Sequence, residues 1–208
     1  MRIRTILAAA AAPAALAAVV LGTTAASAAT GATPNPTATI KITTQAQADG
    51  LSGTTINKNV DIPATVTHAK NLWLNGIHIT GRVTIEGNVT MSGDTVDGNV
   101  YVSGPGSFLA LNNYASHFGG NVAVLASPGI YTGGPGTTSF GNWTQYAGAG
   151  QPTATSQVDG NFIFAGNTGG LYSGYPLHVS GNFVYAGNTV TPSLDRTGLS
   201  VDGQSFVS

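Results

Sequence analysis

The sequence of 208 residues contains no cysteine, and this absence limits both how the protein is stabilised and what it can catalyse. No disulfide can form, and no thiolate is available as a nucleophile or metal ligand. Attachment to a membrane through a lipid-modified N-terminal cysteine is excluded as well. The fold therefore depends on side-chain packing and backbone hydrogen bonds alone.

Charged side chains are scarce, at 7% of the residues. After residue 28 there are five basic and eight acidic residues, which gives a net charge of −3 with histidine neutral. Five scattered cations cannot form a basic patch, so nucleic acid is not expected as a partner. Aliphatic and aromatic residues recur throughout, which favours a packed core over disorder.

Long apolar runs are missing except at the N-terminus. Arg2 and Arg4 precede the apolar stretch "ILAAAAAPAALAAVVLG", and the small-residue pattern Ala26-Ser27-Ala28 follows it. This order predicts a secretory signal peptide over residues 1–28 and a secreted, extracellular or cell-wall-associated mature chain without a membrane span. Residues 29–42 are rich in Thr, Pro and Ala and predict a flexible leader before a single domain at 43–208.

Glycine, asparagine and alternating apolar residues are abundant, and they recur together. "VDGNVYV" at 96–102 returns as "VDGNFIF" at 158–164 and "VSGNFVY" at 179–185. Glycine-asparagine steps or their equivalents are spaced by 17 to 23 residues, a period typical of a solenoid. The eight anchors are Lys58-Asn59, Gly81-Arg82, Gly98-Asn99, Gly120-Asn121, Gly141-Asn142, Gly160-Asn161, Gly181-Asn182 and Gly203-Gln204.

Apolar residues occupy every second position around these anchors, which is a strand pattern. We therefore predict an all-β fold, a single-stranded parallel β-helix of about eight coils. Residues 43–51, "TTQAQADGL", form a helix-like stretch that is expected to cap its N-terminal end. In each repeat the glycine is expected to turn the corner, and the asparagine to begin the next strand. Stacked asparagines predict a hydrogen-bonded ladder of Asn99, Asn121, Asn142, Asn161 and Asn182.

With its coil length, corner glycines and asparagine ladder, the chain resembles the right-handed parallel β-helix proteins of the pectin-lyase-like fold over residues 51–208. That resemblance implies the architecture. Many proteins of this fold cleave polysaccharides, so it also raises the question of an enzyme.

Catalytic residues of that kind are not found in the sequence. The chain has no Asp-Asp pair and no Gly-His-Gly, and its few basic residues have no acidic cluster beside them. We predict no catalytic residue, no metal site and no cofactor. The aspartates before three corner glycines, at Asp97, Asp159 and Asp202, are interpreted as local caps of their turns. Two histidines inside apolar strands, His78 and His178, are expected to point outward.

Aromatic residues in or beside the long loops are the candidate binding residues, because aromatic rings stack on sugars. They are Trp143, Tyr146, Tyr172 and Tyr175.

Taken together, these patterns favour a secreted, non-enzymatic β-solenoid that serves as an extracellular structural or surface-interaction module. The alternative is a carbohydrate-binding or polysaccharide-degrading β-helix protein that uses the loops of residues 125–176, with an extracellular polysaccharide as its partner. The sequence "GLSVDGQSFVS" at 198–208 stays in strand pattern and predicts self-association through this C-terminal edge.

Overall fold

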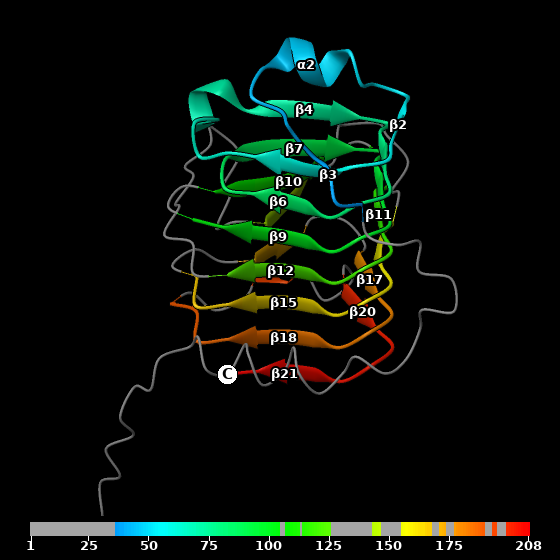
Figure 1. The fold of residues 1–208 in the computed structure, drawn as a ribbon. Coiled ribbons are helices and arrows are strands. Elements are labelled where there is room, and N and C mark those ends of the chain that lie inside the picture. The colour runs from blue at the N-terminus through cyan, green and yellow to red at the C-terminus, as the bar shows by residue number, and fades with distance from the viewer. Residues whose placement is uncertain are drawn as a thin grey trace, which may run out of the picture.

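The computed structural model shows a parallel β-helix whose strands form three parallel sheets along the molecule (Figure 1). It describes residues 36–104, 107–112, 114–125, 143–146, 155–167, 171–173, 177–189, 193–194 and 199–208. Each strand pairs with the equivalent strand of the next coil rather than with its neighbour in sequence. The predicted fold class is therefore confirmed.

Sheet A has eight strands among the described residues and faces the viewer in Figure 1. They are β1 (Thr39–Lys41), β3 (Asn59–Ile62), β6 (Val83–Ile85), β9 (Val100–Ser103), β12 (Val122–Leu125), β15 (Phe162–Ala165), β18 (Phe183–Ala186) and β21 (Ser205–Val207).

Sheets B and C complete the three sides, with seven and six strands in the described part of the chain. Sheet B contains β2 (Thr55–Ile56), β5 (His78–Ile79), β8 (Thr95–Val96), β11 (His117–Phe118), β14 (Ser156–Val158), β17 (Leu177–Val179) and β20 (Leu199–Val201). Sheet C contains β4 (Leu72–Asn75), β7 (Asn88–Ser92), β10 (Phe108–Asn112), β13 (Trp143–Tyr146), β16 (Leu171–Ser173) and β19 (Ser193–Leu194).

The core lies inside the coils and is built by alternation along each strand. In β6, Val83 and Ile85 are fully buried, and Thr84 between them is not. Their equivalents in neighbouring coils are buried in the same way, so apolar columns run along sheet A from β3 to β18. Burial of each such side chain stabilises the fold by about 1.5–3 kcal/mol.

Aromatic stacking continues these columns. The rings of Phe162 and Phe183 have centroids 5.7 Å apart, and those of Phe164 and Tyr185 are 5.2 Å apart and nearly parallel. Both pairs join β15 to β18 inside sheet A.

A second apolar cluster lies on the opposite face of sheet A. Ile163 stands between two core residues of β15 and so points the other way, yet it is only 1% exposed. It clusters with Ala123, Ala165, Val184 and Ala186. Sheet A is therefore buried on both faces from β12 to β18.

The N-terminal end begins earlier than the sequence predicts. Residues 39–41 of the expected flexible leader form β1, which pairs with β3, and Ile42 is buried in the core. The predicted helical cap is present as α2 (Gln45–Asp49), which lies over the end of the solenoid beside β4 (Figure 1). Thr44 and Gln47 form a capping box that fixes the first turn of this helix.

One coil is much longer than the others, and this corrects the expected repeat at Gly141-Asn142. Strand β12 pairs directly with β15, with Val122 opposite Phe162. Strand β13, which begins at Trp143, pairs with β10 and β16 in sheet C. The spacing of glycine-asparagine steps mimicked an extra coil because this one spans about two repeat lengths.

A short 3₁₀ helix, His68–Lys70, joins sheets A and C in the first coils. No helix in the described residues has the length and apolar character that a membrane span requires.

Candidate functional site: a histidine–aspartate row on sheet B

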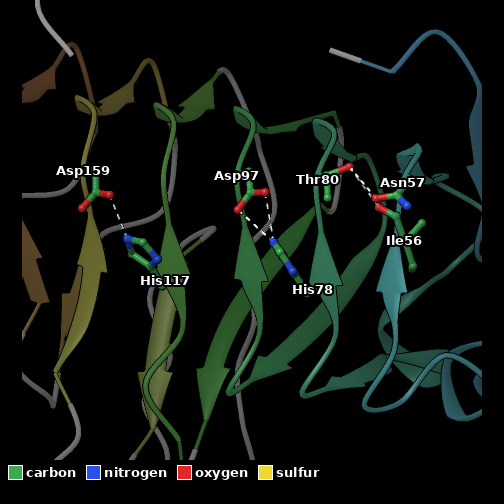
Figure 2. Close-up of polar contacts among 7 residues, drawn as sticks. All are labelled: Ile56, Asn57, His78, Thr80, Asp97, His117 and Asp159. Atoms are coloured by element: carbon green, nitrogen blue, oxygen red, sulfur yellow. Dashed lines mark hydrogen bonds and ion pairs between the residues drawn. The ribbon is translucent and has the colours of Figure 1, made fainter. Parts of the chain in front are cut away.

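Three histidine–aspartate pairs lie on the outer side of sheet B. The Nε2 atom of His78 lies 3.0 Å from Asp97, that of His117 lies 2.8 Å from Asp159, and that of His178 lies 3.1 Å from Asp202. Figure 2 shows the first two pairs, in which each histidine points toward the aspartate of the following coil. We call these six residues the histidine–aspartate row.

The pairs share one construction because the strands share one register. His78 is opposite Thr95, and Asp97 follows two residues later in that coil. Likewise, His117 is opposite Gln157, and Asp159 follows Gln157 by two residues. His178 is opposite Ser200, and Asp202 follows Ser200 by two residues. Histidine and aspartate therefore alternate over six successive coils, and each pair repeats after two coils.

Alternation along the strand sets the outward direction. His78 lies between Ile77 and Ile79, which are 1% and 0% exposed. His178 likewise lies between Leu177 and Val179, both buried. Successive side chains of a strand point to opposite faces, so the histidines are held at the surface by their buried neighbours. The expected outward position of His78 and His178 is confirmed.

Most of the histidines of this chain lie in the row. The whole sequence contains four histidines and eight acidic residues, and the row holds three of each. The side chains are between 31% and 65% exposed. Exposed pairs of this kind contribute about 0–1 kcal/mol to stability, so stabilisation does not account for the row.

The interpretation of Asp97, Asp159 and Asp202 as local turn caps is wrong. Their carboxylates contact histidine side chains of the preceding coil instead. Asp159 also accepts a hydrogen bond of 2.6 Å from the Gln157 side chain. The sequence does contain the signal: three histidines recur at one strand position, each one coil before an aspartate. The false coil at Gly141 concealed it by separating His117 from Asp159.

The asparagine ladder runs beside this face. Asn121 N–H donates to Asn99 Oδ1 at 2.8 Å, and Asn182 N–H donates to Asn161 Oδ1 at 2.9 Å. Asn161 N–H donates directly to Asn121 Oδ1 at 2.8 Å, so the predicted rung at Asn142 is wrong. Asn142 itself lies outside the described residues, and the long coil accounts for the error.

Further amides were missed by the sequence reasoning. Asn59 Oδ1 accepts from Arg82 N–H at 3.0 Å, and Asn182 Oδ1 accepts from Gln204 N–H at 2.8 Å. At another corner, Asn188 Oδ1 accepts from Asn167 N–H at 2.8 Å. The sequence signal for this contact between Asn167 and Asn188 is the repeat of "AGNT" at 165–168 and 186–189.

The glycines before the ladder are required by close stacking of the coils. A Cβ on Gly98 would lie 2.6 Å from the carbonyl oxygen of Gly81, and one on Gly160 would lie 2.7 Å from that of Gly120. No other residue fits such a column without displacing the backbone. These glycines stand at the bends between sheets B and A, as expected, and the close stacking adds a requirement for space.

A buried carboxylate, Asp94, lies at the corner between sheets C and B. Its Oδ1 accepts from Ile77 N–H at 2.7 Å, and its Oδ2 accepts from Ser92 N–H at 2.8 Å. Burial raises the pKa of this carboxyl from 3.8 to about 6, although the two backbone hydrogen bonds act to lower it. Both oxygens are committed to the backbone, so Asp94 has a structural role in this corner.

Three of the four predicted aromatic binding residues lie on strands of sheet C. Trp143 and Tyr146 begin and end β13, and Tyr172 lies on the neighbouring strand β16, opposite Thr144. Trp143 shares its register column with Leu109 and Leu171, which are both core residues. Tyr175 lies outside the described residues.

No set of three histidine or acidic side chains in the described part of the chain is placed to hold a metal ion together. The row is instead a series of two-residue pairs. Comparison with known proteins adds no assignment, because no family model, no curated protein and no solved structure matches the chain.

Proposed function

We propose that this protein is a secreted, non-enzymatic β-solenoid that acts as an extracellular structural or surface-interaction module. The observation that carries the proposal is the histidine–aspartate row, in which one arrangement of exposed side chains repeats every two coils along sheet B. A repeating surface suits a partner that is itself extended, such as a cell wall or another solenoid. The signal peptide predicted from residues 1–28 supports a location outside the cell.

The chemistry of the described residues gives no support to a hydrolase or lyase. Glycoside hydrolysis needs two carboxylates on either side of one bond. The buried carboxylate of Asp94 is held by two backbone N–H groups, and the three exposed aspartates of the row are each held by a histidine. The three row aspartates follow β8, β14 and β20, so no two of them lie in adjacent coils of sheet B.

Self-association through the last coil is part of the same proposal. Strand β21 pairs with β18 and with no other described strand, and its Phe206 and Val207 are 51% and 60% exposed. Unpaired backbone groups of an edge strand accept another strand readily. A second copy or another extracellular β-structure is the expected partner, and replacing Phe206 and Val207 by Ser is expected to abolish concentration-dependent light scattering.

One observation favours carbohydrate binding as a second candidate. Tyr172 is the register partner of Thr144, and Tyr146 follows Thr144 by two residues, so these two tyrosines of adjacent strands share one face of sheet C. A sugar-binding surface on this side would leave the row on sheet B unused, which separates the two candidates.

Binding to cell envelopes tests the proposal. The mature protein, residues 29–208, is mixed with cell-wall preparations and with plant, fungal and bacterial polysaccharides, and both retention and newly formed reducing ends are measured. We expect retention on the envelope without bond cleavage. Replacing His78, His117 and His178 by Gln should weaken it, and His68→Gln should not. Cleavage that is lost on removing one carboxylate would contradict the proposal.

A further inference from the structure

We propose that each histidine–aspartate pair of the row binds one divalent copper or nickel ion, so that the face of sheet B holds three ions in a line. The sequence pattern alone predicted no metal site. The inference goes beyond the structural role proposed above and can fail independently of it, because it concerns the purified protein alone.

The two ligand types in each pair match these metals. A neutral imidazole nitrogen and a carboxylate oxygen form a mixed nitrogen–oxygen donor set, which suits copper and nickel. Calcium and magnesium prefer oxygen ligands alone and would gain only one carboxylate at each pair. Thiolate sites for other metals are excluded by the lack of cysteine.

The separation of the donor atoms is informative. The nitrogen–oxygen distances are 3.0, 2.8 and 3.1 Å. Two ligands about 2.0 Å from a metal and at right angles to each other are about 2.8–2.9 Å apart, whereas tetrahedral ligands are about 3.3 Å apart. The His117–Asp159 separation fits one edge of a square-planar or octahedral site, and the other two separations lie between that value and the edge of a tetrahedral site.

The side chains have room for the ion. A metal at bonding distance from both atoms lies about 1.3 Å to one side of the line that joins them. The histidines are 31–46% exposed and the aspartates 40–65%, so a small rotation of either ring or carboxylate is not blocked by the core. At the middle pair, Gln157 donates to Asp159 Oδ1 and leaves Oδ2 directed at His117. This hydrogen bond would orient the carboxylate ligand.

Two protein ligands leave the remaining coordination positions open. No third histidine or acidic side chain joins any pair among the described residues. Water or donor groups of a partner would complete each site. Because neighbouring strands in a sheet are about 4.8 Å apart, sites two coils apart are separated by about 10 Å.

Copper titration tests this inference. Tag-free protein of residues 29–208 is stripped with a chelator, and copper(II) binding at neutral pH is measured by equilibrium dialysis and by electron paramagnetic resonance. We expect three ions per chain with one imidazole nitrogen each, and a dipolar coupling that corresponds to about 10 Å between neighbouring ions. Binding should weaken at acidic pH because the ligands must lose their protons.

Variants make the test specific. Replacing His78, His117 and His178 together by Gln should remove three ions, as judged by the difference from the wild type. His68→Gln is the matched control, because His68 lies in the 3₁₀ helix outside the row, and it should retain all three. His117→Gln alone should remove the middle ion and leave two ions about 20 Å apart. A triple variant that binds as much copper as the wild type would overturn the inference.

Discussion

Asn121 and Asn161 are 40 residues apart in the sequence, yet the backbone N–H and the side-chain Nδ2 of Asn161 donate to the same oxygen, Oδ1 of Asn121, at 2.8 and 3.0 Å. This pair fixes the register across the long coil. The same register places His117 beside Asp159, which stands two residues before Asn161. The ladder and the His117–Asp159 pair therefore share one register.

The ladder is expected to contribute to stability one amide at a time. Asn161→Ala removes the acceptor of the partly buried Asn182 N–H and one of the two donors to Asn121 Oδ1. We expect the free energy of unfolding to fall by about 1–3 kcal/mol. Asn75→Ala, at an exposed position of β4, is the control and should change it by less than about 0.5 kcal/mol. Equal effects in urea denaturation would contradict the ladder.

Phe183 is central to the aromatic columns and is 1% exposed. Phe183→Ala should lower the free energy of unfolding by about 3–5 kcal/mol, because transfer energy is lost and a cavity remains. Phe206, which is 51% exposed on β21, provides a matched control, and Phe206→Ala should cost less than about 1 kcal/mol. A small effect at Phe183 would mean that this face of β18 points away from the core.

The close stacking of the corner glycines leaves no room for a side chain. Gly98→Ala would place a Cβ 2.6 Å from a backbone carbonyl oxygen, so neighbouring coils must separate. We expect a loss of about 2 kcal/mol or more, or failure to fold. Gly50→Ala is the control, since its Cβ would come no closer than 3.4 Å to another atom, the Ala46 carbonyl oxygen. Thermal melting of both variants checks this, and similar midpoints would contradict it.

The raised pKa of Asp94 should make the stability of the protein depend on pH. Its pKa is about 6 in the folded protein and near 3.8 when unfolded, so the folded state holds the proton more tightly. The free energy of unfolding should therefore fall by about 3 kcal/mol as pH rises from about 4 to about 6, and stay level above that. Urea denaturation at several pH values compares the wild type with Asp94→Asn. The variant should lack this fall, and an identical profile in both proteins would rule out Asp94 as its source.

The repeat, the strands and most of the core could be predicted from the sequence, because alternation and a period near 21 residues are local signals. The helix at Gln45–Asp49 was visible for the same reason. The start of the solenoid was not, since the Thr/Pro/Ala composition of residues 29–42 resembles a linker even where 39–41 pair with β3.

The row was missed because it depends on which coils are adjacent. Histidine and aspartate are far apart in sequence, and one false coil displaced His117 from Asp159. Counting glycine-asparagine steps cannot distinguish a coil from a long insertion, because both preserve the spacing. The decisive information is strand pairing, which brings Val122 beside Phe162 and places Trp143 in another sheet.

Disulfide trapping tests the adjacency of these coils most directly, and the cysteine-free chain makes it unambiguous. His117 and Gln157 are register partners on neighbouring strands, so their Cα atoms are about 4.8 Å apart, within the range of a disulfide. The account predicts that His117→Cys with Gln157→Cys forms an intramolecular disulfide on mild oxidation. His117→Cys with His178→Cys, two coils apart, should keep free thiols. Free thiols in the first variant, or a disulfide in the second, would contradict the account.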